Sequence, residues 1–309
     1  MKSYQIKFPH GIMFHHFHGK NNPVVQGSIG KETLSEIIEF IGTENILNAN
    51  EWAIKFQNHS IKSNHVCLTF DDALKSQVDV ALPVLRSYGL TGFFFIYSSI
   101  FEGIKENLEI YRYFRTTQFS NIEDFYEKFF NYLKNFTEYD KIQKGLKKFD
   151  SEEYLKNCVF YSKSDKKFRY IRDQILTKEE YFKIMDKLIQ ESKINLEKIY
   201  EKIWMSQLDL EKINKENHII GLHSYSHPTK FSSLSYKNQN EEYEKNKKHL
   251  EKINSKIFAM SHPTNSYNKD TLEILKKLNI TIGFRADMNP IKSNLEIPRQ
   301  DHSIITNML

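Results

Sequence analysis

The sequence contains little cysteine: two residues, Cys67 and Cys158, in a chain of 309. Two cysteines cannot build a disulfide scaffold, and they are too few for a zinc site made of cysteines. An excess of one charge is also missing, because 44 Lys and Arg residues stand against 39 Asp and Glu residues, a difference of 44 − 39 = 5. So small and dispersed an excess argues against a nucleic-acid partner.

Long hydrophobic runs are missing as well. The longest apolar stretch, residues 93–97, has the length of a strand, far short of the roughly 18 residues of a membrane span. Residues 1–14 lack the apolar segment of about 7–15 residues that a secretory signal contains. We therefore expect a cytoplasmic protein without an integral membrane segment.

Proline and glycine are sparse in the middle of the chain. No proline lies between Pro83 and Pro228, and residues 101–215 contain two glycines. Capping-box patterns at residues 120–123 and 177–180 each precede apolar residues at helical spacing. This predicts an α-helical insertion over 101–215, whose many aromatic side chains pack helices together in preference to stacking on a ligand.

The flanks of this insertion alternate between two patterns. Short apolar runs typical of strands occupy residues 65–71, 91–97, 219–223, 256–260 and 280–284. Helical patterns lie between them at residues 31–41, 78–88, 241–253 and 271–278. Such alternation predicts a parallel sheet or barrel covered by helices, formed by residues 1–100 and 216–309. In such folds the chemistry gathers at the carboxyl ends of the strands.

Two adjacent carboxylates, Asp71 and Asp72, end one predicted strand. Close carboxylates repel each other unless a cation intervenes. A bound metal would give each a role, one as a ligand and the other as a proton acceptor. The alternative is that the pair caps the helix that follows, and the pair alone does not decide between the two.

Two histidines, His223 and His227, follow another predicted strand at a spacing that suits one metal ion. Position 224 is serine, not the glutamate of a zinc-protease helix, and Pro228 disfavours helix at His227. A turn is therefore expected here. Taken alone, the histidines could be unrelated loop residues. Together with the Asp pair, they supply ligands that leave positions open for water and substrate.

These residues resemble the signatures of the polysaccharide deacetylases, the NodB-homology or carbohydrate-esterase-4-like group. Residues 68–72 (LTFDD) resemble the first signature and residues 223–227 (HSYSH) the second. Residues 81–95 are similar to the helix and strand between them, and residues 262–268 (HPTNSYN) resemble the third signature. Each motif is weak alone, but four in the family's order are specific.

The resemblance implies a distorted (β/α)7 barrel and a catalytic divalent metal ion, with zinc as the first candidate. By the resemblance, Asp72, His223 and His227 hold the metal and Asp71 is the catalytic base. Water activated at this site would attack an amide or ester carbonyl. His302 is the candidate for the late histidine that serves as general acid in the family.

The resemblance also assigns His262, Pro263 and Thr264 to the substrate, with a backbone N–H near Thr264 helping to hold the oxyanion. The arginine that usually opens this signature and orients the base is missing. Arg299 or Arg285 is expected to replace it.

Four further positions bear on how closely the chain follows the family. Ala73 and Asn265 stand where glycine is usual, and asparagine tolerates a left-handed backbone. His15 and His16 resemble the Tyr-His pair of intracellular-type members. Either one of them lies beside the substrate at the barrel mouth, or both belong to a histidine-rich surface loop.

The expected function is removal of an acetyl group from an N-acetylated sugar, such as a nucleotide- or lipid-linked glycan precursor. The insertion separates the first two metal signatures, so it is expected to cap the barrel mouth and bind the sugar and a diphosphate. A deformylase or another C–N hydrolase on the same scaffold is one alternative. A non-catalytic glycan-binding protein is another.

Overall fold

The computed structural model describes residues 4–104, 106–156 and 161–309. The chain divides into two compact units, one formed by residues 1–106 and 200–309 and the other by residues 107–199. The second unit is shorter than the expected insertion, 101–215, because the helix at 207–215 packs against a strand of the first unit. We call the two parts the barrel unit and the helical unit.

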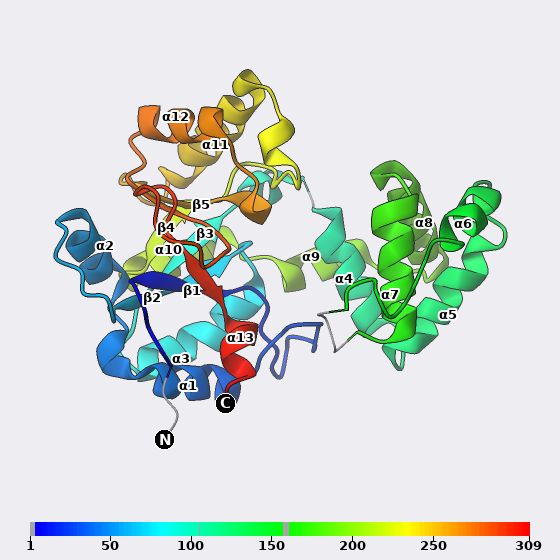
Figure 1. Ribbon diagram of the computed structural model, residues 1–309, viewed down its shortest axis with the longest axis horizontal. Helices are drawn as coiled ribbons and strands as arrows, with labels where there is room; N and C mark the ends of the chain where they lie inside the picture. Colours follow the sequence, from blue (N-terminus) through cyan, green and yellow to red (C-terminus); the bar gives the residue numbers. More distant parts are fainter. Residues whose placement is uncertain (1–3, 105, 157–160) are drawn as a thin grey trace. The chain divides into compact units, whose positions relative to one another are not determined.

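Seven parallel strands form a nearly closed barrel in the barrel unit (Figure 1). They lie side by side in the order β6-β5-β4-β3-β2-β1-β7. Their bounds are β1 (His10–Phe14), β2 (Val66–Asp71), β3 (Gly92–Ile96), β4 (Ile219–Leu222), β5 (Ala259–Ser261), β6 (Ile282–Phe284) and β7 (Arg299–Asp301). The expected (β/α)7 barrel is therefore confirmed.

The gap between β6 and β7 is bridged by a segment that begins in a turn, residues 294–298. The Gly283 amide donates to the carbonyl of Asn294 at 2.8 Å, and the Ile297 amide donates to the carbonyl of Gly283 at the same distance. A Cβ on Gly283 would lie 2.8 Å from the Leu295 backbone, so this approach requires glycine. The segment then passes to β1, where Gly11 donates to the carbonyl of Pro298.

Helices surround the strands of the barrel unit (Figure 1). They are α1 (Lys31–Ile41), α2 (Ala49–Gln57), α3 (Leu82–Ser87), α10 (Gln207–Lys215), α11 (Tyr236–Leu250), α12 (Lys269–Lys277) and α13 (His302–Thr306), with short turns η1 (Thr43–Asn45), η2 (Gln77–Ala81), η3 (Ser99–Glu102), η5 (Phe231–Ser233) and η6 (Pro263–Asn265). Fully buried Trp52 of α2 stacks on Phe56 and meets the edge of Phe93 on β3. Aromatic packing thus fixes α2 against the sheet.

The helical unit consists of α4 (Asn107–Thr117), α5 (Ile122–Leu133), α6 (Tyr139–Leu146), α7 (Lys163–Tyr170), η4 (Ile171–Ile175), α8 (Lys178–Glu191) and the first half of α9 (Leu196–Ile203). The predicted capping box at Thr177 is present, with its side chain accepting from the Glu180 amide. The box expected at residues 120–123 lies one residue later, at Asn121 and Asp124. An asparagine side chain caps as well as serine, which explains the shift.

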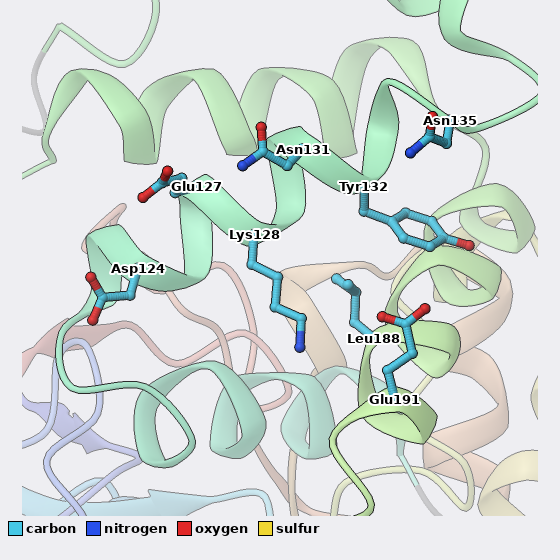
Figure 2. Close-up of a pocket in the computed structure, with 8 residues that line it drawn as sticks. All are labelled: Asp124, Glu127, Lys128, Asn131, Tyr132, Asn135, Leu188 and Glu191. Atoms are coloured by element: carbon cyan, nitrogen blue, oxygen red, sulfur yellow. The ribbon is translucent and has the colours of Figure 1, made fainter.

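Aromatic side chains form the core of the helical unit. Phe125, Phe129 and Tyr181 pack around the ring of Phe168, with centroid distances of 5.4, 5.0 and 6.2 Å. These residues are buried, as the packing interpretation of the aromatics predicts. A shallow hollow lies between the outer face of α5 and the end of α8 (Figure 2). Across residues 4–104, 106–156 and 161–309, no helix combines the length and hydrophobicity needed to cross a bilayer.

Candidate metal centre and catalytic base

The side chains of the candidate site come from the carboxyl ends of neighbouring strands. Asp71 is the last residue of β2, Ser261 is the last residue of β5, and His223 directly follows β4. Because all these strands are parallel, their ends meet at one end of the barrel. The sequence prediction that chemistry gathers at strand ends applies to each of them.

A left-handed turn brings both carboxylates to this end of the barrel. Asp72 and Ala73 have φ angles of 78° and 53°. On a regular strand the two Asp side chains would point to opposite sides, so the turn is what gathers them. Ala73 adopts the left-handed backbone that favours glycine, at a cost of about 1–2 kcal/mol for a residue with a Cβ. The alternative of a simple helix cap does not describe this geometry.

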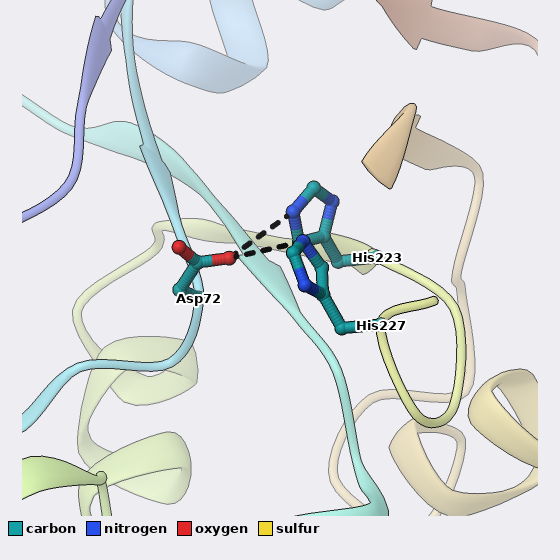
Figure 3. A group of neighbouring side chains, drawn as sticks. All are labelled: Asp72, His223 and His227. Atoms are coloured by element: carbon teal, nitrogen blue, oxygen red, sulfur yellow. Dashed lines mark ion pairs between the residues drawn. The ribbon is translucent and has the colours of Figure 1, made fainter. Parts of the chain in front are cut away.

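Asp72, His223 and His227 converge on one point, with one ligand atom from each lying within 4.8 Å of the others. The Oδ1 atom of Asp72 is 3.3 Å from Nε2 of His223 and 3.5 Å from Nε2 of His227 (Figure 3). His223 directs its Nδ1–H toward the carbonyl of Ser261 at 2.9 Å. In the neutral ring, Nε2 therefore presents a lone pair to Asp72.

Three acceptor atoms that face one another require a cation between them. Asp72 Oδ1 is sealed from solvent and has no hydrogen-bond donor among the described residues. Such an orphaned carboxylate oxygen is costly unless a metal or a proton occupies the space. The donor set, one carboxylate and two imidazoles, is one that zinc and related divalent ions accept. The residues present therefore fit a divalent metal.

The pKa values in this cluster follow from burial and charge. Burial alone would raise the pKa of Asp72, but His227 and His223 hold it well below its usual range. Burial lowers the pKa of His227 to about 4, so its ring is neutral at pH 7. The pKa of His223 is raised, because Asp71 and Asp72 outweigh its burial. Without a metal, the proton between these groups therefore resides on His223.

The loop that carries the histidines is a strained turn, as predicted, and not a helix. Ser224 and His227 have φ angles of 61° and 53°. Glu242 on α11 accepts from the backbone amides of Tyr225 and Ser226 at 3.0 and 2.8 Å, and from the Ser226 hydroxyl at 2.7 Å. This one carboxylate fixes the middle of the loop and so maintains the strained conformation.

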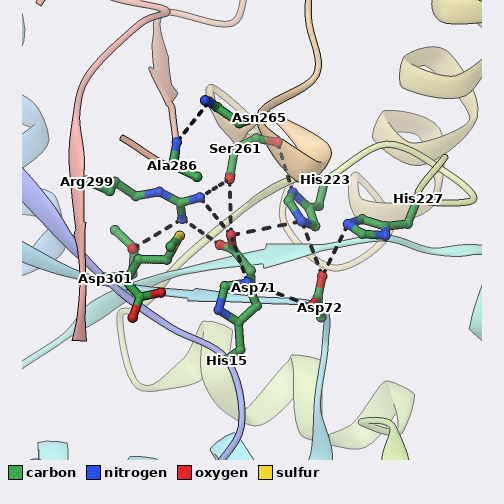
Figure 4. A network of polar contacts seen from close by, with 12 residues as sticks. His15, Asp71, Asp72, His223, His227, Ser261, Asn265, Ala286, Arg299 and Asp301 are labelled. Atoms are coloured by element: carbon green, nitrogen blue, oxygen red, sulfur yellow. Dashed lines mark hydrogen bonds and ion pairs between the residues drawn. The ribbon is translucent and has the colours of Figure 1, made fainter. Parts of the chain in front are cut away.

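Asp71 is buried and held by an arginine from β7. Arg299 donates from both terminal nitrogens to the two oxygens of Asp71, at 2.7 and 2.8 Å (Figure 4). Ser261 donates to Asp71 at 3.3 Å and accepts from Arg299 at 2.7 Å. Burial would raise the pKa of Asp71, but the guanidinium of Arg299 outweighs it and lowers the pKa. Of the two arginines expected to orient the base, Arg299 is the one in contact with it.

Gly11 on β1 makes room for this arginine. Its register partner on β7 is Arg299. A Cβ on Gly11 would lie 3.0 Å from both Cγ of Arg299 and Cγ2 of Thr69. The sequence analysis did not identify this requirement, because a single glycine in a strand does not reveal which side chain passes it.

His15 faces both carboxylates. Its Nε2 lies 3.8 Å from Asp71 Oδ2 and 3.9 Å from Asp72 Oδ2, and its side chain is 31% exposed. It therefore borders the site, whereas His16 contacts His15 through stacked rings. Gln77 fixes the segment by donating to the carbonyls of His15 and Asp71 at 2.9 and 2.6 Å. Gln77 was not recognised from the sequence, because its role depends on a turn between distant strands.

One residue of the third signature, His262, does not lie where the sequence analysis expected it. His262 is buried, donates from Nε2 to the carbonyl of Leu295 at 2.8 Å, and stacks on Tyr267. This burial contradicts the predicted contact of His262 with substrate, because the ring packs inside the protein. Pro263 is buried as well, whereas Thr264 is exposed.

The turn of the third signature survives without glycine. Thr264 and Asn265 have φ angles of 50° and 57°, which is the left-handed backbone expected for Asn265. Asn265 donates to Asp287 at 2.9 Å and accepts from the Ala286 amide at 3.0 Å. These two bonds compensate for the strain of a residue with a Cβ in this conformation.

His302 does not face the Asp–His cluster. Its two ring nitrogens each lie 3.2 Å from a backbone carbonyl, those of Met13 and Gly27, and the ring stacks on Phe14. Burial lowers its pKa. With both nitrogens directed at carbonyl oxygens, this histidine has no free path to a substrate at the metal centre. The geometry contradicts the predicted role as general acid.

The comparisons with known proteins agree with this geometry. Residues 182–283 match the family model described as polysaccharide deacetylase. No curated protein gives a match. The solved structures similar to this chain include the deacetylase PplD of Streptococcus pyogenes in complex with acetate, at 15% identity and a TM-score of 0.55, covering 96% of this chain and 92% of that one.

Two further structures are similar over nearly the whole chain. IcaB from Ammonifex degensii has 12% identity and a TM-score of 0.55, covering 96% of this chain and 91% of that one. A de-N-acetylase from Aggregatibacter actinomycetemcomitans has the same identity and TM-score, covering 97% and 99%. At such identities the likeness establishes the fold, and the family model adds the relationship in sequence. Residues 182–283 thus match the polysaccharide deacetylase family model, and the chain as a whole has the fold of solved deacetylases.

Proposed function

We propose that this protein is a metal-dependent amide hydrolase that removes an acetyl group from an N-acetylated sugar. One observation carries the proposal: a three-residue acceptor cluster, Asp72, His223 and His227, lies directly beside a second carboxylate that an arginine holds separately. This separation gives one aspartate to a metal and leaves the adjacent one, Asp71, to accept a proton.

Asp72, His223 and His227 would hold the metal, with zinc as the first candidate for this donor set. When bound, such an ion supplies Lewis-acid activation of water and of an amide carbonyl. The Nδ1–H of His223 is held by the Ser261 carbonyl, which orients its Nε2 lone pair toward the site.

Asp71 is proposed as the general base. Its lowered pKa keeps it ionised at neutral pH, so it accepts the proton that water loses. Arg299 fixes the orientation of the carboxylate, and Ser261 supports both groups. His15 borders the same space and is proposed as a substrate-facing residue together with Thr264. His302 is not carried into the proposal.

The acetylated substrate is supported by the family and by one relative, because PplD is described in complex with acetate. That the sugar is a nucleotide- or lipid-linked precursor, and that the site operates in the cytoplasm, stay predictions from the sequence. So does a capping role for the helical unit.

The test combines metal content with product analysis. Protein purified without chelator should contain about one divalent ion per chain by elemental mass spectrometry, and Asp72→Ala and His223→Ala should lose it. Asp71→Asn should keep the metal and lose release of acetate from N-acetylated sugars. Asp270→Ala, at an exposed position on α12, is the control and should change neither.

Two outcomes would redirect the proposal. Formate released in place of acetate would identify the deformylase alternative. An absence of bound ion, together with sugar binding that Asp71→Asn does not affect, would identify a glycan-binding protein without turnover.

A further inference from the structure

The two proposed histidine ligands are oriented in different ways. The Nδ1–H of His223 is directed at the carbonyl of Ser261 at 2.9 Å, the usual means by which proteins orient a metal-binding imidazole. His227 has its Nε2 3.5 Å from Asp72 (Figure 3), and in the described part of the chain no group of the protein hydrogen-bonds to its Nδ1. Its backbone is also strained, with a φ angle of 53°. The orientation of this ring therefore depends on the side chains packed against it.

Tyr97, the residue that follows β3, is one of the side chains packed against this ring. The ring centroids of Tyr97 and His227 lie 5.4 Å apart, and the two ring planes are inclined by 37°. The side chain of Tyr97 is buried, at 1% exposure. Protein interiors are close-packed, so a buried ring that moves leaves a void on one side and a clash on the other. The position of the His227 ring therefore follows that of Tyr97.

Trp204, the residue that follows α9, fixes the direction of Tyr97. Its indole N–H donates to the phenol oxygen of Tyr97, and the Trp204 side chain is itself buried. A buried indole has one N–H and needs an acceptor for it, so this bond sets where the phenol group points. Tyr200, one turn earlier on α9, packs against the same indole with a centroid distance of 6.1 Å. All of these residues belong to the barrel unit.

The same segment also holds the turn that carries the third proposed ligand. The Met205 amide donates to the carbonyl of Ala73 at 2.8 Å, and Ala73 directly follows Asp72. Leu74 forms an isolated antiparallel bridge with Trp204. The left-handed turn after β2 is thus paired, through its backbone, with the two residues after α9. Together with Tyr97, this segment reaches the ends of three neighbouring strands, β2, β3 and β4.

We infer that Trp204 is a positioning residue for the proposed metal ion. Through the ring of Tyr97 it orients His227, and through the amide of the next residue it fixes the turn that carries Asp72. Trp204 is neither a ligand nor a substrate contact in this role. The inference rests on the proposed function, because it requires a metal ion in this cluster.

The first test compares the same substitution at the two tryptophans of the chain. Trp204→Phe keeps a buried ring but removes the N–H donor. Its affinity for zinc, measured by competition with a chromophoric chelator, should fall about 10–100-fold. Trp52→Phe is the matched control, because Trp52 is buried too but its N–H has no acceptor among the described residues. This control should bind zinc as tightly as the wild type.

Two further measurements separate positioning from a general loss of packing. The visible spectrum of the cobalt(II)-loaded protein depends on ligand geometry, so it should change in Trp204→Phe and stay as in the wild type in Trp52→Phe. Tyr97→Phe removes the acceptor of the same hydrogen bond and should also weaken zinc binding, which covers the case in which Trp204→Phe does not fold. Because both changes break one bond, the double variant should bind zinc no more weakly than the weaker single variant.

The outcomes distinguish this inference from the proposed function. Unchanged zinc affinity and an unchanged cobalt spectrum in both Trp204→Phe and Tyr97→Phe would overturn the inference and leave the proposed function intact. An equal loss of affinity in Trp52→Phe would also overturn it, because any buried indole would then have the same effect. A wild type that takes up neither metal would overturn both.

Discussion

Asp71 is a buried carboxylate whose charge is balanced inside the barrel by one guanidinium. Burial raises the pKa of Asp71, and Arg299 is the largest of the groups that lower it, so loss of Arg299 would raise that pKa. The arginine therefore does two things for the proposed base: it favours the ionised form of Asp71 and it orients the carboxylate. Neither requires Arg299 to touch the substrate, so it is a positioning residue.

Replacing Arg299 with methionine should reduce kcat by about 10²–10⁴-fold, the usual contribution of a positioned base. The acid limb of the kcat/KM profile should move to higher pH, because the pKa of Asp71 rises, whereas metal content should stay unchanged. Arg299→Lys restores the charge and should recover part of the shift. A variant with reduced kcat but an unshifted pH profile would show that Arg299 acts on structure alone.

Metal affinity should depend on pH through His223. Its pKa is raised above 6.5, so protons compete with the metal already above that pH, and affinity should fall as the pH decreases through this range. His227, with a pKa of about 4, does not compete until much lower pH. Zinc competition titrations at pH 6, 7 and 8 measure this, and an affinity that is constant over the three values would contradict it.

At the scale of elements, the candidate metal site depends on α11 as much as on the strands. Glu242 holds the backbone of the histidine loop. Asn246, one turn later, accepts from the His223 amide at 3.0 Å and donates to the carbonyl of Ile96 at 2.9 Å. A helix from one part of the barrel thus clamps the loop after β4 to the end of β3.

Glu242→Ala should weaken metal affinity by about 10–100-fold, as the loss of a group that orients metal ligands does. The neighbouring Glu241→Ala is a matched control, because Glu241 makes an exposed i,i+4 pair with Lys237 and contacts no part of the loop in the described structure. Both variants should unfold cooperatively. Equal metal affinity in the two would show that the loop holds its shape unaided.

The apolar runs predicted β2 to β6, and no pattern in the sequence predicted β7, which is polar. β2 and β3 are fully buried runs, so their pattern is unambiguous. β7 is three polar residues, Arg-Gln-Asp, which no periodicity distinguishes from a loop. For the same reason, the sequence offered Arg299 as a candidate to orient the base but could not distinguish it from Arg285. The sequence analysis did not identify Gly11, Gln77 or Glu242, because their roles arise from contacts between distant segments.

At the scale of the whole molecule, several buried histidines are folded in their neutral form. Burial lowers the pKa of His218 to about 4, and its Nδ1 accepts from the Gly92 amide at 3.0 Å. The unfolded chain, with a histidine pKa near 6.5, binds more protons between these values. The contribution of His218 to the free energy of unfolding is therefore fully present above pH 6.5 and is lost as the pH falls toward 4.

Urea unfolding at pH 7.5 and pH 5 should show this loss, to which His218 contributes up to roughly 2 kcal/mol at about 1.4 kcal/mol per pKa unit. His218→Gln should be less stable at pH 7.5 but should lose less on acidification. His59→Gln, at an exposed position, should follow the wild type. An identical pH dependence in all three proteins would remove His218 from the explanation.

The sequence predicted that a helical insertion interrupts an α/β body, but it did not predict where the insertion begins and ends. Sparse glycine and proline indicated the helical insertion, yet α10 carries the same composition and packs on β4. Composition indicates which secondary structure a segment forms, but it does not indicate which part of the protein the segment packs against. The structure therefore assigns residues 200–215 to the barrel unit.

The position of β7 has a consequence for the order in which the parts of the candidate site assemble during synthesis. β1 and β7 are neighbours in the barrel but come from opposite ends of the chain, so the ribosome delivers Arg299 long after Asp71. A nascent barrel can already contain every proposed metal ligand while the proposed base still lacks its counter-charge. On the proposed function, full activity would wait for the last strand to dock, and a chain clipped before residue 299 would keep the three proposed ligands but lose the arginine that faces Asp71.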